Sequence, residues 1–297
     1  MHIVFFWITQ IERADKKIMY ETIIPLLLGV VQGLTEFLPV SSSGHLVLLQ
    51  HFAGIDEPAI LFDICLHVGT LMAVLLIFYK DILAMIKAIL QIPGKLFSEK
   101  RSSIIALIRE DPELKTALLI IVGTIPTGLM GIFFRKQVDV LFGSISLVGL
   151  MLIITGIFLG ITRFVQPGTK SIKDMSAWTA IFLGIIQGLA IIPGISRSGA
   201  TITAAILIKM DRSLAGRFSF LLSIPSILGA LVLELGKPVG DPIFSYPMIL
   251  AASIVSFAVG YFALQILLRV VNKGRLYYFS PYCLLIGGGV IIGINFF

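Results

Sequence analysis

Residues 29–45, GVVQGLTEFLPVSSSGH, and residues 184–200, GIIQGLAIIPGISRSGA, decide the fold. Both stretches open with Gly, two hydrophobic residues, Gln, Gly and Leu, and both close with S-x-S-G. Each interrupts an apolar region, 22–54 or 177–208, and leaves arms of roughly 10 to 17 residues, whereas a spanning helix needs about 20. Polar, broken backbone is tolerated at membrane depth only inside protein or beside a watery cavity. We therefore predict two re-entrant helix hairpins.

The composition is that of a membrane protein. The chain of 297 residues is 57% hydrophobic and 13% charged, with a mean hydropathy of +1.00. A soluble domain carries about 25% charged residues, so this chain has too few to cover a water-facing surface. The net charge of +6 comes from residues in short loops, which favours membrane orientation over nucleic-acid binding. Cys65 and Cys283 lie in apolar runs and are expected to be reduced and without metal.

The rest of the chain supplies six apolar segments of spanning length. Each hairpin is followed by three of them, and because three is odd, the second copy must insert upside down relative to the first. The predicted fold is an all-α polytopic membrane protein with six transmembrane helices and two re-entrant hairpins in an inverted-topology repeat. Residues 19–164 form the first repeat, 165–297 the second, and 1–18 an extension, with Met19 as an alternative start. The predicted spans are 60–79, 114–134, 145–164, 213–235, 246–271 and 278–296.

Lysine and arginine counts give the orientation. With the mouth of the first hairpin on one side, the opposite side receives sixteen basic residues, against six including the extension. The side rich in basic residues is cytoplasmic. Both termini and the mouth of the first hairpin are then expected on the outer face of the membrane. The long loop 80–113 has apolar residues at helical spacing and is predicted to contain an interfacial amphipathic helix.

The first break carries groups that are costly to place in a bilayer. Glu36 lies deep in an apolar helix, where a carboxylate costs at least about 2.5 kcal/mol and needs a partner or a task. Gln32 lies one turn earlier on the same face. Hydroxyls and a glycine then lead into a new helix, whose free N-terminal amides attract phosphate. His45 lies in its first turn and can exchange protons or attack phosphorus. The hydroxyls are Ser41, Ser42 and Ser43.

The second break supplies a cation. Arg197 is permanently charged and has a planar fork suited to phosphate oxygens. Ser196, Ser198 and Thr201 surround it and again lead into a helix. If the hairpins meet, a base, a nucleophile, an acid and an anion clamp come together, the minimum set for phosphoryl transfer. The competing interpretation is that Pro and Gly kink these helices and Ser caps them.

Three further polar residues are weighed separately. Asp63 and His67 lie one turn apart at the start of a span, either as a structural pair or at the entrance of the site. Gln187 matches Gln32 in the repeat and is expected to support the second loop by hydrogen bonding.

From about Met19 onwards the sequence resembles the undecaprenyl-diphosphatase, or bacitracin-resistance, family. The resemblance is carried by QGLTEFLPVSSSGHL at 32–46 and PGISRSGATI at 193–202. It implies hydrolysis of undecaprenyl diphosphate, which regenerates the lipid carrier for cell-wall synthesis, and dependence on Mg²⁺ or Ca²⁺. Many members have Glu where this chain has Gln32, so a metal would rest on Glu36, the Gln32 carbonyl oxygen and the substrate.

Carried over by position, the resemblance implies Ser42, His45 and Glu36 as catalytic residues, and Ser42 or His45 as the nucleophile. The phosphate-binding residues that it implies are Arg197, Ser196 and Thr201, and from the two breaks themselves we also expect Ser198, Ser41 and Ser43 to bind phosphate. The expected partners are the lipid substrate and membrane lipids, without nucleic acid, and a homodimer is an open alternative to a monomer. The rival function is a polyprenyl-phosphate transporter or flippase, since inverted repeats with broken helices are common in transporters.

Overall fold

The computed structural model describes residues 19–55, 60–98, 104–134, 137–235 and 243–296, and in these ranges every regular segment is a helix. The expected all-α membrane class is therefore confirmed, while the proposed extension at residues 1–18 lies outside the described residues. Besides the elements introduced below, the structure contains η1 (Met19–Ile23), α9 (Val138–Phe142), η2 (Thr162–Phe164), η3 (Ile172–Asp174) and η4 (Leu276–Phe279).

Five helices in the described ranges are long and apolar enough to cross a membrane. They are α8 (Pro112–Phe134), α10 (Ile145–Ile161) continued by η2, α13 (Arg212–Leu235), α14 (Tyr246–Asn272), and α15 (Ser280–Phe296) preceded by η4. The sixth expected span, 60–79, is α4 (Ile60–Ile77), which continues into α5 (Tyr79–Leu90) through a bend of 73°. The bend falls where the apolar run gives way to Lys80 and Asp81, so the count is six if α4 and α5 form one span.

Both polar breaks are helical hairpins. The first consists of α2 (Ile24–Phe37) and α3 (Ser42–Phe52), and the second of α11 (Ala177–Leu189) and α12 (Arg197–Leu207). A proline in each break, Pro39 or Pro193, removes a backbone donor and prevents the helix from continuing. Each returning helix then begins at a serine cap, Ser41 or Ser196, whose hydroxyl accepts from the amide three residues later.

The two halves of the chain exchange packing partners. The incoming helix α2 packs on α14, α11 packs on α8, and α10 packs on α15. Small residues allow the first two contacts, since a Cβ on Gly29 would lie 2.5 Å from the Ala252 carbonyl oxygen and one on Gly184 would collide with Gly123. Each contact uses a Gly-x-x-x-Gly spacing on the hairpin helix, the pattern that brings membrane helices close together. Each of these three pairs therefore joins a helix from the first half of the chain to a helix from the second.

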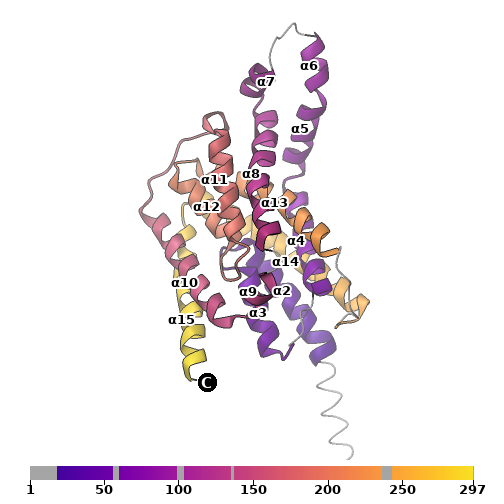
Figure 1. Ribbon diagram of the computed structural model, residues 1–297, viewed down its shortest axis with the longest axis vertical. Coiled ribbons are helices and arrows are strands. Elements are labelled where there is room, and N and C mark those ends of the chain that lie inside the picture. The colour runs from indigo at the N-terminus through magenta and orange to yellow at the C-terminus, as the bar shows by residue number, and fades with distance from the viewer. Residues whose placement is uncertain (1–18, 56–59, 99–103, 135–136, 236–242, 297) are drawn as a thin grey trace, which may run out of the picture.

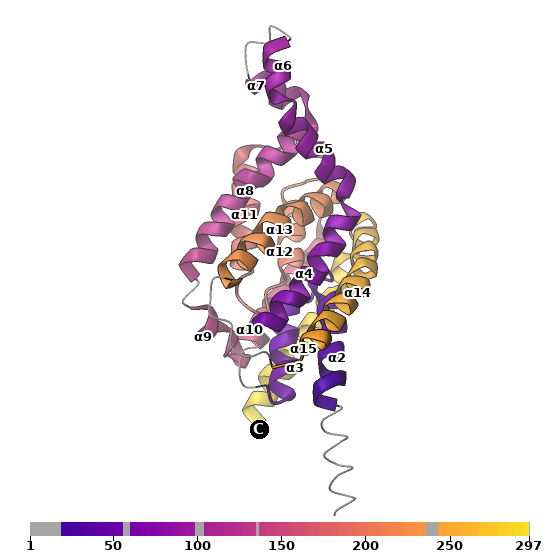
Figure 2. The same ribbon diagram turned by 90° about the vertical axis from the view of Figure 1, so that its right-hand side faces the viewer.

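The hairpins lie toward opposite ends of the molecule (Figures 1 and 2). In both views α2 and α3 lie toward the end that holds the C-terminus, and α11 and α12 lie toward the other end. Beyond that other end project α5, α6 (Ile92–Ser98) and α7 (Ile104–Glu110). The described parts of the loop 80–113 thus contain helices, as expected, and Ile82 and Met85 on α5 pack against the main core.

The main hydrophobic core surrounds the place where the hairpins approach each other. Phe37, the last residue of α2, is fully buried and meets the ring of Phe220 edge-on at 5.8 Å. The core continues through residues of α4, α12, α13 and α14, so that both breaks rest on packed apolar side chains. Cys65 and Cys283 are free, as predicted.

Candidate active site

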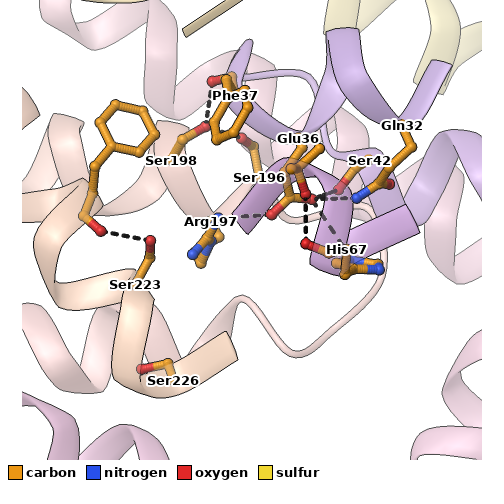
Figure 3. A network of polar contacts seen from close by, with 12 residues as sticks. Gln32, Glu36, Phe37, Ser42, His67, Ser196, Arg197, Ser198, Ser223 and Ser226 are labelled. Carbon is orange, nitrogen blue, oxygen red and sulfur yellow. Dashed lines mark hydrogen bonds and ion pairs between the residues drawn. The ribbon is translucent and has the colours of Figure 1, made fainter. Parts of the chain in front are cut away.

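The carboxylate of Glu36 is the centre of a polar cluster between the hairpins. Its Oε1 lies 2.7 Å from Nη2 of Arg197. Its Oε2 accepts hydrogen bonds from Ser42 Oγ at 2.6 Å and Gln32 Nε2 at 3.1 Å, and lies 3.7 Å from His67 Nε2. Figure 3 shows these side chains converging from α2, α3, α4 and α12. The expectation that the hairpins meet is confirmed by this geometry.

Arg197 enters the cluster as the first residue of α12. Its side chain is 18% exposed and that of Glu36 only 6%, so the ion pair is largely removed from water. One guanidinium nitrogen, Nη1, is buried without a protein partner in the part of the chain that the structure describes. A buried donor without a partner is costly, and in a functional site it marks the place of a ligand or water. Nη2 of the arginine is therefore bonded to Glu36, while Nη1 is able to donate to an anion.

Residues 38–41 form the tip of the first hairpin and residues 190–196 the tip of the second. Hydrogen bonds at these tips hold the two hairpins together. Ser41, in the left-handed region with φ 70°, accepts from Gly44 N of its own helix at 3.3 Å and from Gly194 N of the other hairpin at 3.2 Å. Ser198 donates to the carbonyl oxygen of Phe37 at 2.9 Å. A Cβ on Gly199 would lie 3.0 Å from Pro39, so the glycine in the S-x-S-G motif permits this close approach.

The hydroxyls expected to bind phosphate divide into two groups. Ser42, which is partly buried, is bonded only to Glu36 in the described interactions. The other hydroxyls bond to groups other than the Glu36 carboxylate. Ser43 lies 3.4 Å from Ser41, and Ser196 caps α12. Thr201 donates to the Arg197 carbonyl oxygen at 2.8 Å and contacts Ser219. Thr201 is 1% exposed and Ser198 is 2% exposed, so both hydroxyls support the tips in this structure.

His45 lies apart from the Glu36 cluster and has a partner on each ring nitrogen. Its Nδ1 is 2.8 Å from the Ser41 carbonyl oxygen, and its Nε2 is 2.7 Å from the hydroxyl of Tyr282. Tyr282 belongs to α15 and was missed by sequence reasoning, because it is separated from His45 by 237 residues and lies in no motif. The two rings are stacked with centroids 5.7 Å apart and planes 10° apart.

His67 and Asp63 belong to the surroundings of the site. His67 Nδ1 bonds to the backbone oxygen of Asp63 at 2.8 Å, while the Asp63 carboxylate accepts from Gln50 of α3 at 2.8 Å. The two side chains are therefore not hydrogen-bonded to each other in the described interactions. The alternative prediction, that these residues line the site, agrees with the contact between His67 and Glu36.

One supporting residue differs from the sequence expectation. The side chain of Gln187 has no described hydrogen bond to the second tip, so the prediction that it supports this loop was wrong. Its amide donates instead to Thr127, to the Leu222 carbonyl oxygen and to Ser226. In the first hairpin Gln32 bonds to Glu36, four residues later. The residue four positions after Gln187 is Ile191, whose side chain cannot accept a hydrogen bond. The tip is supported instead by Thr155 of α10, which donates to Gly194 O at 2.9 Å and accepts from Ser196 N at 3.2 Å.

The residues suit a divalent cation only if a ligand shares it. The described residues hold no group of three or more His, Cys, Asp or Glu side chains that would form a metal cage. However, the carbonyl oxygen of Gln32 is buried and has no described partner, one turn from Glu36. Mg²⁺ is commonly held by one or two protein oxygens together with substrate phosphates and waters. The pair fits that pattern.

Comparison with known proteins adds the following similarities. Residues 25–289 match the family described as bacitracin resistance protein BacA. Over 262 residues, 88% of this chain and 94% of the relative, the sequence is 47% identical to the undecaprenyl-diphosphatase of Desulforapulum autotrophicum. It is 48% identical over 267 residues to the protein of that name from Desulfatibacillum aliphaticivorans, covering 90% and 96% of the two chains. For the Desulfosudis oleivorans protein of that name the identity is 47% over 269 residues, 90% and 97% of the chains.

Proposed function

The chain belongs to the bacitracin resistance protein BacA family, and we propose that it hydrolyses undecaprenyl diphosphate to undecaprenyl phosphate and inorganic phosphate. This reaction returns the lipid carrier to cell-wall synthesis and opposes bacitracin. The observation that carries the proposal is the short bond from Ser42 to a buried carboxylate that also faces Arg197. A transporter needs to bind its substrate but has no use for a hydroxyl bonded to a base.

We propose Ser42 as the nucleophile. Glu36 takes the hydroxyl proton through Oε2, the Ser42 Oγ forms a bond to the terminal phosphorus, and the bond to undecaprenyl phosphate breaks. Arg197 stabilises the charge on the transferring group through Nη1, which has no described protein partner. His45 is less suited to attack, because both of its ring nitrogens already have hydrogen-bond partners.

Water completes the reaction in a second step. The water oxygen forms a bond to the phosphorus of phospho-Ser42, and the bond from phosphorus to Oγ breaks. Glu36 returns its proton to Oγ, while His45 accepts a proton from the water. His45 follows Ser42 by three residues on α3, and residues at this spacing are neighbours on one helix face.

For the expected cofactor, we propose that Gln32 Oε1 and Glu36 hold a Mg²⁺ or Ca²⁺ ion together with the diphosphate. When bound, such an ion supplies positive charge to the phosphate oxygens. The unpartnered Gln32 oxygen supports this assignment. We also propose a plasma-membrane location with the site open to the outer face, supported by the excess of basic residues on the opposite side.

The test is phosphate release from undecaprenyl diphosphate by the purified protein in detergent, with and without Mg²⁺ or Ca²⁺. Ser42→Ala and Arg197→Ala are expected to abolish release. Ser253→Ala, which removes a hydroxyl bonded within α14, and Arg269→Ala, at the end of α14, serve as matched controls. Absence of release from folded wild-type protein would refute the proposal and make lipid transport the next function to test.

A further inference from the structure

Tyr282 lies beside the proposed site without a role in the reaction as described so far. It comes from the first turn of α15, at the far end of the chain, and its ring is 42% exposed. Its hydroxyl is 2.7 Å from His45 Nε2, and the ring stacks on the imidazole. Together with Cys283, whose Sγ lies 3.6 Å from the Pro39 carbonyl oxygen, Tyr282 thus brings the last helix of the second half to the first hairpin.

The hydrogen-bond pattern fixes the chemistry of His45. The Ser41 carbonyl oxygen can only accept, so Nδ1 of His45 carries a hydrogen. Nε2 is then the nitrogen that gains and loses a proton, and the Tyr282 hydroxyl occupies it. A hydroxyl can donate to bare Nε2 and can accept from protonated Nε2, so it remains a partner in both states. A backbone carbonyl or an ammonium group at this position would match only one state.

We propose that Tyr282 is a further catalytic residue, which relays the proton of the attacking water to His45. This inference rests on the proposed phosphatase function and on its second step. As the water oxygen bonds to phosphorus, the water gives a proton to Tyr282 Oη, and the proton of Tyr282 passes to His45 Nε2. Tyr282 ends the step neutral, as it began, and His45 ends it protonated.

The direct test is Tyr282→Phe, which removes one oxygen and keeps the stacked ring. The variant is expected to lower kcat about tenfold, a part of the 10²–10⁴ that acid–base catalysis supplies, and to lower KM in proportion, so that kcat/KM is unchanged. Because only the second step is slowed, acid-quenched samples are expected to contain more phospho-Ser42 than wild type, measured by mass spectrometry. The matched control is Tyr278→Phe, on the adjacent η4, where the hydroxyl contacts neither hairpin in the described interactions.

A double-variant cycle separates a relay from a structural role. In a His45→Ala background the Tyr282→Phe change is expected to have no further effect on kcat, because the acceptor of the proton is already missing. Thermal unfolding in detergent monitors folding, and Tyr282→His, which keeps a group able to donate and accept, is expected to recover part of the rate. Additive losses, a rise in KM alone, or a full rate in a folded Tyr282→Phe protein would overturn the relay.

Failure of the relay and failure of the function give different results. If wild-type protein releases phosphate and Tyr282→Phe matches it, the relay is wrong and the phosphatase remains. If wild-type protein releases none under any metal condition, both proposals are wrong.

Discussion

The ion pair between Glu36 and Arg197 is expected to affect stability and turnover by separate routes. The two side chains are 6% and 18% exposed and lie 2.7 Å apart. Either Glu36→Gln or Arg197→Gln leaves one buried charge without its partner, which costs about 3–5 kcal/mol. At roughly 2–4 °C per kcal/mol for a large domain, each single variant is expected to unfold on the order of 10 °C lower. Each is also expected to lose phosphate release, by about 10²–10⁴ for the missing base.

The double variant, Glu36→Gln with Arg197→Gln, separates the two effects. Neither charge remains, so most of the lost stability is expected to return, because replacing a whole buried pair is often close to neutral. Phosphate release is expected to stay lost, because the base and the anion clamp are both absent. The assays are thermal unfolding in detergent and phosphate release on the same preparations.

A more exposed pair provides the control. Arg217 contacts Asp81 with side chains that are 46% and 24% exposed, and breaking it is expected to cost no more than about 1 kcal/mol. A double variant of Glu36 and Arg197 as unstable as the worse single variant would refute the coupling. Recovery of phosphate release in that double variant would remove both residues from the chemistry.

Three further predictions concern packing, pH and metal. Gly184→Ala is expected to lower stability by at least about 1–3 kcal/mol in thermal unfolding, because its Cβ would collide with Gly123, whereas Gly289→Ala, facing open space in the described structure, changes little. Burial raises the pKa of Asp111, but the hydrogen bond and charge of Lys95 and the backbone amides of Leu114 and Glu113 together outweigh it, so the pKa is lowered. This stabilisation is present above the ordinary value near 3.9 and is lost as pH falls through the lowered pKa, a pH dependence that Asp111→Asn should diminish in unfolding measurements. Chelation with EDTA is expected to stop phosphate release and added Mg²⁺ or Ca²⁺ to restore it; release that continues in EDTA would contradict the proposed cation.

Much of the fold follows from patterns that are local in sequence. Length and apolarity predict the long helices, and the repeated S-x-S-G motif with its proline predicts both hairpins. The bend between α4 and α5 was not anticipated, because hydropathy measures how apolar a helix is and contains no information about its direction. The projecting helices α5 to α7 likewise depend on packing against α8.

The site was partly predictable for a physical reason. A carboxylate and a guanidinium in apolar surroundings require partners, so Glu36 and Arg197 were expected to face each other. Tyr282 and Thr155 carry no such signal, since a hydroxyl in a membrane helix can bond to its own backbone. Ser198 and Thr201 share the motif with Arg197, but the direction of each hydroxyl depends on the neighbouring helix, which sequence spacing does not specify.

The separation of 161 residues between the two members of the ion pair has a consequence for biogenesis. At about 5–20 residues per second, the ribosome needs roughly 8–32 s to make Arg197 after Glu36. During that time the end of α2 has no cation to pair with in α12, and the tip amide of Gly194 that bonds to Ser41 has not been made. We therefore expect the first hairpin to reach its final depth in the membrane only after the second has been synthesised. Ribosome-bound chains truncated before residue 194 are expected to leave the first tip accessible to water-soluble thiol reagents through a cysteine introduced at Ser42, whereas full-length chains protect it.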